Sequence, residues 1–393
     1  MATRCAKRAP ISTCPRQCKS GPDWPGLQTR VRVVIPKTNA QKAGDNSTQY
    51  QVSGDLVVVQ GVTETRALEI ATQAAHDVMA NYSAESQEIA LDRIGKFDVA
   101  MVKKLSDSDL LGALADPAVQ VALRKAQLGA ASSERESDYD LLASLIEDRV
   151  KRGSDRPVRS GIDRAVEIVD QIDDTALTGL TVMQAASQYQ AVTANIEPGL
   201  TTMETLLTEL LSGRALPTGV AWIEHLDVLG AIRIEGLQSF LKFDAFWPSK
   251  TPGYVAMGVE AESEAEDLGR KEMAGYGLDL NPVPDHELKP GFRRLPFARE
   301  EELATLLRDT AHRPETDVEG AVRVANDIFG LGTRDETAAV EFLRLVKLRP
   351  SHARLAEWWD SLPIYFSVTP VGRVLARANA QRLDAEGLLP PLT

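Results

Sequence analysis

Residues 116–127 read DPAVQVALRKAQ, and they show how the helices of this chain begin. Asp116 can accept a hydrogen bond from a free backbone N–H, and Pro117 suits the first helical position, where no N–H is needed. Similar start signals recur along the chain: Ser160 with Asp163, Thr201 with Glu204, and Thr369 with Pro370. Short helices with regular start signals predict a compact helical array from about residue 64 onward.

Length and composition indicate an ordinary globular protein. The 393 residues are 43% hydrophobic and 25% charged, which excludes a wholly disordered chain, a collagen-like chain and a disulfide scaffold. Purely apolar runs are short, such as residues 56–59, and no charged-then-apolar leader is present at the start. We therefore expect a cytoplasmic protein without a membrane partner.

Charge divides the chain into two parts. Residues 1–42 carry nine Lys or Arg and one acid, whereas the remaining residues carry 35 bases and 55 acids. The acidic body should repel phosphate, and no basic patch stands out along the sequence, so we do not expect nucleic acid as a partner. Cys5, Cys14 and Cys18 lack a nearby fourth metal ligand. Residues 1–42 are therefore interpreted as a disordered basic extension, or as sequence upstream of the true start codon.

Residues 44–61, GDNSTQYQVSGDLVVVQG, contain a Gly-Asp pair that recurs after ten residues. Alternation after the first pair and a β-branched run after the second predict two short strands, which we term the β arm (residues 43–63). An isolated hairpin is marginal in water, so the β arm should pair either with its own chain or with other copies. The candidate oligomerisation residues are Gly44, Asp45, Tyr50, Val52, Gly54, Asp55, Val57 and Val59.

The second half of the chain is more mixed. Short strand-like runs at 231–234 and 364–368 each adjoin a helical pattern, an order similar to winged-helix packing. The proline-rich stretch 247–297 is predicted to be a loop-rich insert, either a small subdomain or a functional loop. The predicted fold class is thus α-rich α+β, with a helical domain at 64–214 and a mixed α+β domain at 215–393.

Five segments carry a resemblance to a known family: GDNST…GD, DPAVQVALRKAQ, SLIEDRVKR, AVEIVDQI and SVTPVGRVLARANAQ. Their order along residues 40–393 resembles an uncharacterised family of bacterial proteins with no assigned activity. The resemblance implies a soluble bacterial protein with a β arm and a helical body. It supplies no catalytic residues.

The sequence shows no catalytic motif, no cofactor-binding motif and no metal site that we would assign. The histidines are not spaced as ligands on one helix face: His76, His225, His286, His312 and His352. Asp285 and Glu287 are flanked by prolines, and residues 260–267 form an acidic run that is typical of a solvated surface. The GLGT stretch at 330–333 is similar to an annexin calcium loop, but it is fully explained by a helix that ends at Gly330 and a next helix capped by Thr333 with Glu336.

Aromatic residues concentrate in two places, although they make up only 5% of the chain. Phe240, Phe243, Phe246 and Trp247 recur at helical spacing, and Trp358 and Trp359 are adjacent. Such rings can line a ligand groove, but packed core is the commoner arrangement.

These observations favour a non-enzymatic interaction or assembly protein. We expect it to form a homo-oligomer through the β arm and to bind an unknown protein partner through its helical body. One alternative is a hydrolase that uses carboxylates of the 260–287 loop. Another is a regulator that contacts nucleic acid through the winged-helix-like C-terminal part.

Overall fold

The computed structural model describes residues 62–79, 83–191, 193–309 and 314–390. Within these residues it contains fifteen α-helices and two small antiparallel sheets, so the α-rich α+β fold class is confirmed. The eight candidate oligomerisation residues of the β arm lie outside the described residues. No helix in the described part is long and apolar enough to cross a membrane.

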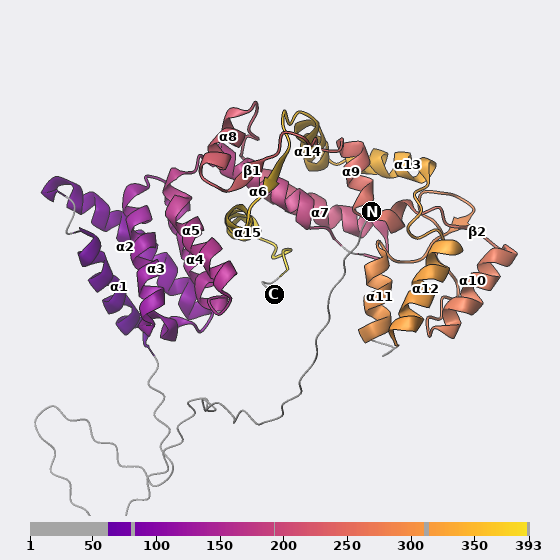
Figure 1. Ribbon diagram of the computed structural model, residues 1–393, viewed down its shortest axis with the longest axis horizontal. Helices are drawn as coiled ribbons and strands as arrows, with labels where there is room; N and C mark the ends of the chain where they lie inside the picture. The colour runs from indigo at the N-terminus through magenta and orange to yellow at the C-terminus, as the bar shows by residue number, and fades with distance from the viewer. Residues whose placement is uncertain (1–61, 80–82, 192, 310–313, 391–393) are drawn as a thin grey trace, which may run out of the picture. The chain divides into compact units, whose positions relative to one another are not determined.

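The first seven helices occupy the chain up to residue 211 (Figure 1). They are α1 (Glu64–Met79), α2 (Ala84–Asp107), α3 (Pro117–Ser132), α4 (Glu136–Lys151), α5 (Arg156–Ile168), α6 (Asp174–Gln188) and α7 (Ile196–Leu211). Two short 3₁₀ turns, η1 (Leu111–Ala115) and η2 (Val169–Gln171), connect them.

The rest of the described chain mixes helices with very short strands. The helices are α8 (Ala221–Val228), α9 (Phe243–Ser249), α10 (Glu264–Gly275), α11 (Glu300–Asp309), α12 (Glu315–Asp327), α13 (Glu336–Lys347), α14 (Pro350–Asp360) and α15 (Pro370–Leu383), with a 3₁₀ turn η3 (Pro252–Val255). The strands are β1 (Ile232–Ile234), β2 (Val259–Glu260), β3 (Phe292–Arg293) and β4 (Phe366–Val368).

The two strands expected near residues 231–234 and 364–368 are both present, and they pair with each other. β1 and β4 are antiparallel, with Ile232 opposite Val368 and Ile234 opposite Phe366. The pair joins segments about 130 residues apart instead of forming a hairpin. β2 pairs with β3 inside the stretch that was expected to be loop-rich, and α10 lies there too.

Helix starts agree with the sequence signals in two places and differ in two others. Asp116 caps α3 with Pro117 in the first turn, and Thr369 caps α15 ahead of Pro370. The predicted start at Ser160 is wrong, because α5 begins earlier, where Asp155 accepts from the N–H of Val158. The predicted start at Thr201 is also wrong, because α7 already begins at Ile196.

The main hydrophobic core extends from Ala67 to Ala380 and includes residues on both sides of position 214. The last helix, α15, lies against α4, α5 and α6 (Figure 1), although almost 200 residues separate it from α6. Small residues permit this packing: Gly161 of α5 faces Pro370, and Gly372 faces the carbonyl of Ala231. The N-terminal helices are therefore completed by a helix from the far end of the described chain.

A second hydrophobic cluster lies within residues 259–331. It is built from α10, α11, α12 and Val259 of β2, with fully buried centres at Met273, Leu303 and Phe329. This part, which we term the second core, carries its own set of buried side chains apart from the main cluster.

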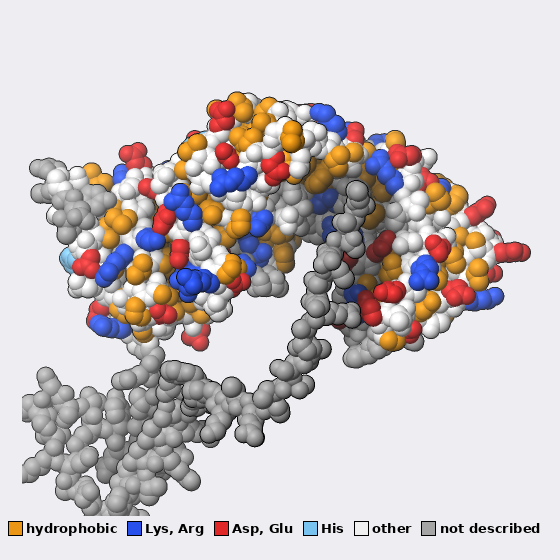
Figure 2. Space-filling view, in the orientation of Figure 1, with side chains coloured by type: hydrophobic (Ala, Val, Ile, Leu, Met, Phe, Trp, Pro, Cys, Tyr) orange, Lys and Arg blue, Asp and Glu red, His pale blue; other side chains and the backbone are white. Residues whose placement is uncertain are grey.

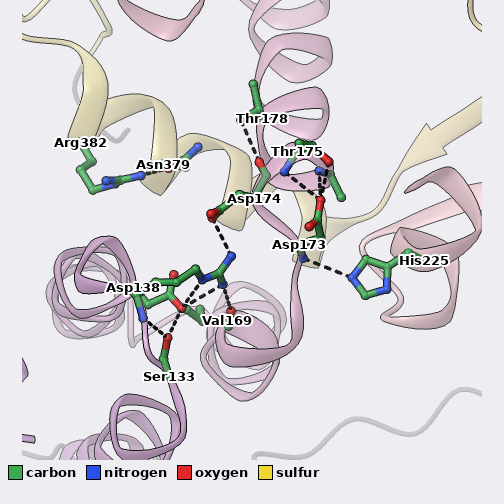
Figure 3. A network of polar contacts seen from close by, with 12 residues as sticks. Ser133, Asp138, Val169, Asp173, Asp174, Thr175, Thr178, His225, Asn379 and Arg382 are labelled. Atoms are coloured by element: carbon green, nitrogen blue, oxygen red, sulfur yellow. Dashed lines mark hydrogen bonds and ion pairs between the residues drawn. The ribbon is translucent and has the colours of Figure 1, made fainter. Parts of the chain in front are cut away.

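A polar network fastens the start of α4 to α6 (Figure 3). Arg135 donates to Asp138 at 3.0 Å and to Asp174, the first residue of α6, at 2.6 Å. On the neighbouring α15, the buried amide of Asn379 donates to the Thr181 hydroxyl of α6 at 2.8 Å. These bonds satisfy polar groups that would otherwise be costly to bury.

Candidate functional site

The carboxylates of the 260–287 loop do not converge on one site. Glu266 is buried and pairs with Arg293 at 2.6 Å, while its other oxygen accepts from the N–H of Glu262. Glu287 accepts from the first N–H of α7 and from Arg294, and it therefore caps that helix. The Asp285 side chain is 91% exposed. Each of the two buried or half-buried carboxylates thus holds two parts of the fold together.

The GLGT loop at 330–333 has the geometry of a helix-to-helix turn. Gly330 has a φ of +60°, which suits the end of α12, and Gly332 donates to the side chain of Asn326 at 2.7 Å. Asp335, and not Thr333, caps α13 by accepting from Ala338. The described residues contain no group of three or more His, Cys, Asp or Glu that could hold a metal ion.

The two aromatic concentrations come together in the main core. Phe246 stacks on Trp359 with ring centres 4.3 Å apart, and Phe240 contacts the same indole edge-on at 5.6 Å. Phe243 and Trp358 are buried as well. Because the rings pack on each other, they form core and do not line an open groove.

The buried histidines have structural partners. His286 bonds the carbonyl of Ala256 at 2.9 Å, and His352 bonds Glu204 at 2.7 Å. Burial lowers the pKa of both imidazoles. Glu204 was expected to cap its own helix, but it accepts from the backbone of Ser351 and joins α7 to the start of α14 instead.

One hollow, of about 750 Å³, is an open groove beside α1 and α3. Its charged lining is largely paired, since Arg66 bonds Glu69 at 2.8 Å and Arg124 bonds Asp77 at 3.0 Å. The groove therefore offers little free charge to a ligand.

Free positive charge is concentrated where α4, α5 and α15 meet. Residues 149–164 contain six bases and two acids, and residues 370–383 contain three bases and no acid. The two segments pack together in the fold. In Figure 2, blue side chains lie about the position of α15, while red ones are frequent over α10. We define the arginine face as Arg152, Arg156, Arg159, Arg373 and Arg377.

The arginine face differs from its surroundings because its members form no close ion pair with a carboxylate of the described residues. Among the described residues, no ion pair joins any of its five guanidinium groups to an acid. The neighbouring bases are paired: Arg149 with Asp163, Lys151 with Glu147, and Arg164 with Glu167. Three members of the face instead donate to backbone carbonyls, Arg159 to Gly153, Arg373 to Val368 and Arg377 to Pro390.

Local sequence explains how the arginine face is positioned. The Asp155 cap and Pro157 start α5 directly after α4, so Arg152 and Arg156 lie on either side of a tight junction. Arg373 and Arg377 are four residues apart and share one side of α15. Arg156 and Arg373 are exposed, and the other three are half-buried.

One buried acid lies beside the arginine face. Burial and the nearby Glu147 carboxylate raise the pKa of Asp148 to about 6, against the opposing effects of Lys151, Arg377 and Arg152. Asp148 is therefore charged at neutral pH and offsets part of the positive field there. The face remains rich in guanidinium groups, which bind carboxylates or phosphates in a bidentate manner.

The sequence did not predict this surface, because residues 149–164 and 370–383 each carry only a modest excess of positive charge. The signal that could have found it was the absence of acids from 370–383, in a chain with a net charge of −12. Only the packing of α15 on α4 and α5 brings the two halves together.

Comparison with known proteins gives one match. The model of a protein family, a domain-of-unknown-function type whose description states no activity, matches residues 61–276, more than half of the chain. No curated protein and no solved structure matches. The family match includes α5 and ends before α15, so it covers only one half of the arginine face.

Proposed function

We propose, from the premise that the chain belongs to the family whose model spans residues 61–276, that this protein is a non-enzymatic interaction protein. In this proposal the helical body binds an acidic partner protein through the arginine face. The observation that carries it is a group of five arginines that form no close ion pair with a described carboxylate, on a chain whose net charge is −12.

The chemistry of the face favours carboxylates. A guanidinium group is planar, always charged and less strongly hydrated than an ammonium group, so it pairs well with Asp or Glu at an interface. Two exposed and three half-buried arginines supply both contact area and charge. Arginine is also among the residues enriched at protein interfaces.

A partner protein suits the surface better than a nucleic acid does. Asp148, Asp155 and Asp163 lie among the basic residues of α4 and α5, so an unbroken row of phosphates would meet local repulsion. A protein can place its acids to match the arginines and to avoid these aspartates. The overall negative charge also opposes binding of a long polyanion.

The direct test is charge reversal at the two exposed arginines, Arg156→Glu with Arg373→Glu. The probe is a glutamate-only decapeptide, with a single-stranded DNA decamer as the competing ligand. We expect the peptide to bind the wild-type chain, with affinity falling as NaCl is raised from about 50 to about 300 mM. The double variant should lose about tenfold in affinity.

Arg323→Glu is the matched control, since Arg323 is also an exposed helical arginine without an acidic partner among the described residues. It should leave peptide binding unchanged. Equal binding of the peptide by the wild type and the double variant would contradict the proposal that the arginine face binds an acidic partner. Preference for the DNA decamer, lost in the double variant, would replace the partner protein with a nucleic acid.

Self-association through the β arm is a separate part of the proposed function, and its support is the strand pattern of residues 44–61. Light-scattering mass should be compared between chains 41–393 and 62–393, since α1 begins at Glu64. We expect a defined oligomer for the longer chain and a folded monomer for the shorter one. Two monomers would contradict assembly through the β arm.

A further inference from the structure

A hairpin formed by residues 284–294 lies at the boundary between the main core and the second core. Its two arms are joined by backbone hydrogen bonds, one of them from the N–H of His286 to the carbonyl of Phe292 at 2.8 Å. Val283, just before the hairpin, is buried in the second core, whereas Leu288 in its turn is buried in the main core. The hairpin therefore connects the two cores.

Charged side chains of the hairpin fasten it to two helices of the main core. Glu287 accepts from the first N–H of α7 at 3.1 Å, and Arg294 donates to the carbonyl of Ala194, just ahead of that helix, at 2.7 Å. Lys289 pairs with Asp335, the N-cap of α13, at 2.7 Å. These contacts depend on the shape of the hairpin, because all three side chains come from its turn or its arms.

His286 is buried in this hairpin, and both of its ring nitrogens bond backbone groups. Nδ1 accepts from the N–H of Leu288 at 3.2 Å, and Nε2 lies 2.9 Å from the carbonyl oxygen of Ala256. A backbone N–H can only donate and a carbonyl can only accept, so the ring is neutral with its proton on Nε2. A second proton would have to occupy Nδ1, where it would face the Leu288 N–H.

The surroundings of the imidazole also disfavour a second proton. Burial has the largest effect and lowers the pKa of His286 from its ordinary value of 6.5, although the Ala256 carbonyl opposes this change. The cations of Arg294 and Lys289 lower the pKa further, and the carboxylate of Asp335 on the α13 side raises it. In an open, solvated hairpin the pKa would return to about 6.5. The closed form is therefore fully favoured above that pH, and this preference is lost as pH falls below it.

We propose that His286 is a pH switch for the attachment of the second core: a proton on Nδ1 removes the acceptor of the Leu288 N–H, opens the 284–294 hairpin and frees the second core from α7 and α13. The proton need not enter the closed hairpin. It binds His286 during transient opening and then stabilises the open form. Helices α2–α6 form none of the hairpin contacts described above, so they should stay folded.

The test is hydrogen exchange of the full chain at about pH 7.5 and about pH 5.5, on either side of the ordinary pKa of histidine, with each rate divided by the intrinsic rate at the same pH. The normalised exchange of residues 286–294 should rise several-fold at the lower pH, up to about tenfold, while α2–α6 stay unchanged. His286→Asn does not titrate, and its side-chain oxygen can still accept from the N–H two residues on. Its normalised exchange in the hairpin should be the same at both pH values.

His76→Asn is the matched control, because His76 is exposed on α1, and this variant should keep the full wild-type response. If His286→Asn fails to fold, His286→Gln can still donate to the Ala256 carbonyl without titrating, and it should lose the response as well. Three results would overturn the proposal: a wild type without a pH response in the hairpin, a response that persists in the His286 variant, or an equal acceleration in α2–α6.

Discussion

Asp98 is a carboxyl group enclosed by three helices. It lies on α2 and accepts from the Gln127 amide of α3 at 3.0 Å, and the same amide donates to the carbonyl of Ala71 on α1. Burial raises its pKa to about 6, and the Gln127 hydrogen bond opposes that rise. The ionised form is therefore less favourable in the folded chain than in the unfolded one.

Asp98→Asn should raise the free energy of unfolding by about 1–3 kcal/mol at pH 7. The folded-state pKa of Asp98 is raised from 3.8 to about 6, so the contribution of this group to stability is fully present below the lower value and is lost as pH rises through the upper one. The advantage of Asn should disappear near pH 4. Urea unfolding at both pH values measures this, with the exposed Asp92→Asn as control. An advantage that is equal at both pH values would contradict it.

Lys250→Met tests a pH dependence of stability that has the opposite sign to that of Asp98. Burial, with a contribution from Arg299, lowers the pKa of Lys250 from 10.5 to about 7. Between these values the unfolded chain binds more protons, so the wild type should gain about 1–2 kcal/mol relative to Lys250→Met as pH rises from about 7 to about 9. Lys347→Met, at a half-exposed ion pair with Asp244, should show no such pH dependence in urea unfolding.

At the scale of elements, the close approach of α15 to Ala231, the residue that precedes β1, depends on one glycine. A Cβ at Gly372 would lie 2.0 Å from the carbonyl oxygen of Ala231, which is backbone and cannot move aside easily. The Thr369 hydroxyl donates to the same carbonyl at 2.9 Å and accepts from Gly372 at 3.2 Å. The N-cap of α15 and the close approach of Gly372 to the backbone therefore both involve the carbonyl of Ala231.

Gly372→Ala should lower the free energy of unfolding by at least about 1–3 kcal/mol, because backbone must shift to admit the methyl group. Gly95→Ala is the matched control. Gly95 lies within α2 with nothing within 4 Å of the added Cβ, so alanine should stabilise there by about 0.5–1 kcal/mol. Thermal unfolding of both variants should show shifts of opposite sign. Shifts of the same sign would contradict the assigned contact.

Helix existence was predictable from the sequence, whereas several helix boundaries were not. The helix starts predicted at Asp116 and Thr369 are correct, because each residue precedes a proline that fixes the first turn. The helix start predicted from Thr201 and Glu204 is wrong, because the carboxylate of Glu204 accepts from the backbone of α14, almost 150 residues away. The arginine face was missed for the same reason, since proximity across the fold leaves little trace in local spacing.

At the scale of the whole molecule, two large hydrophobic clusters are separate within the described chain, and a third, small cluster joins α1, α2 and α3. The main core takes in residues from α1 to α15, while the second core is confined to residues 259–331. Such separation allows the smaller cluster to open without the larger one.

Leu303→Ala, in the second core, and Leu142→Ala, in the main core, test this independence. Both side chains are 0% exposed, so each substitution should cost about 2–5 kcal/mol locally. Hydrogen exchange in Leu303→Ala should accelerate in α10–α12 and stay near wild-type rates in α2–α6. Leu142→Ala should accelerate exchange in α2–α6. Uniform acceleration by Leu303→Ala would show that the two clusters unfold together.

The position of α15 against α4, α5 and α6 also has a consequence for synthesis. A ribosome adds roughly 5–20 residues per second, so on the order of 10–40 s pass between the emergence of α6 and that of α15. Throughout that interval the nascent chain exposes the apolar surface that Leu375, Ala376 and Ala378 later cover. Newly made chains should therefore be most dependent on chaperones during the second half of translation.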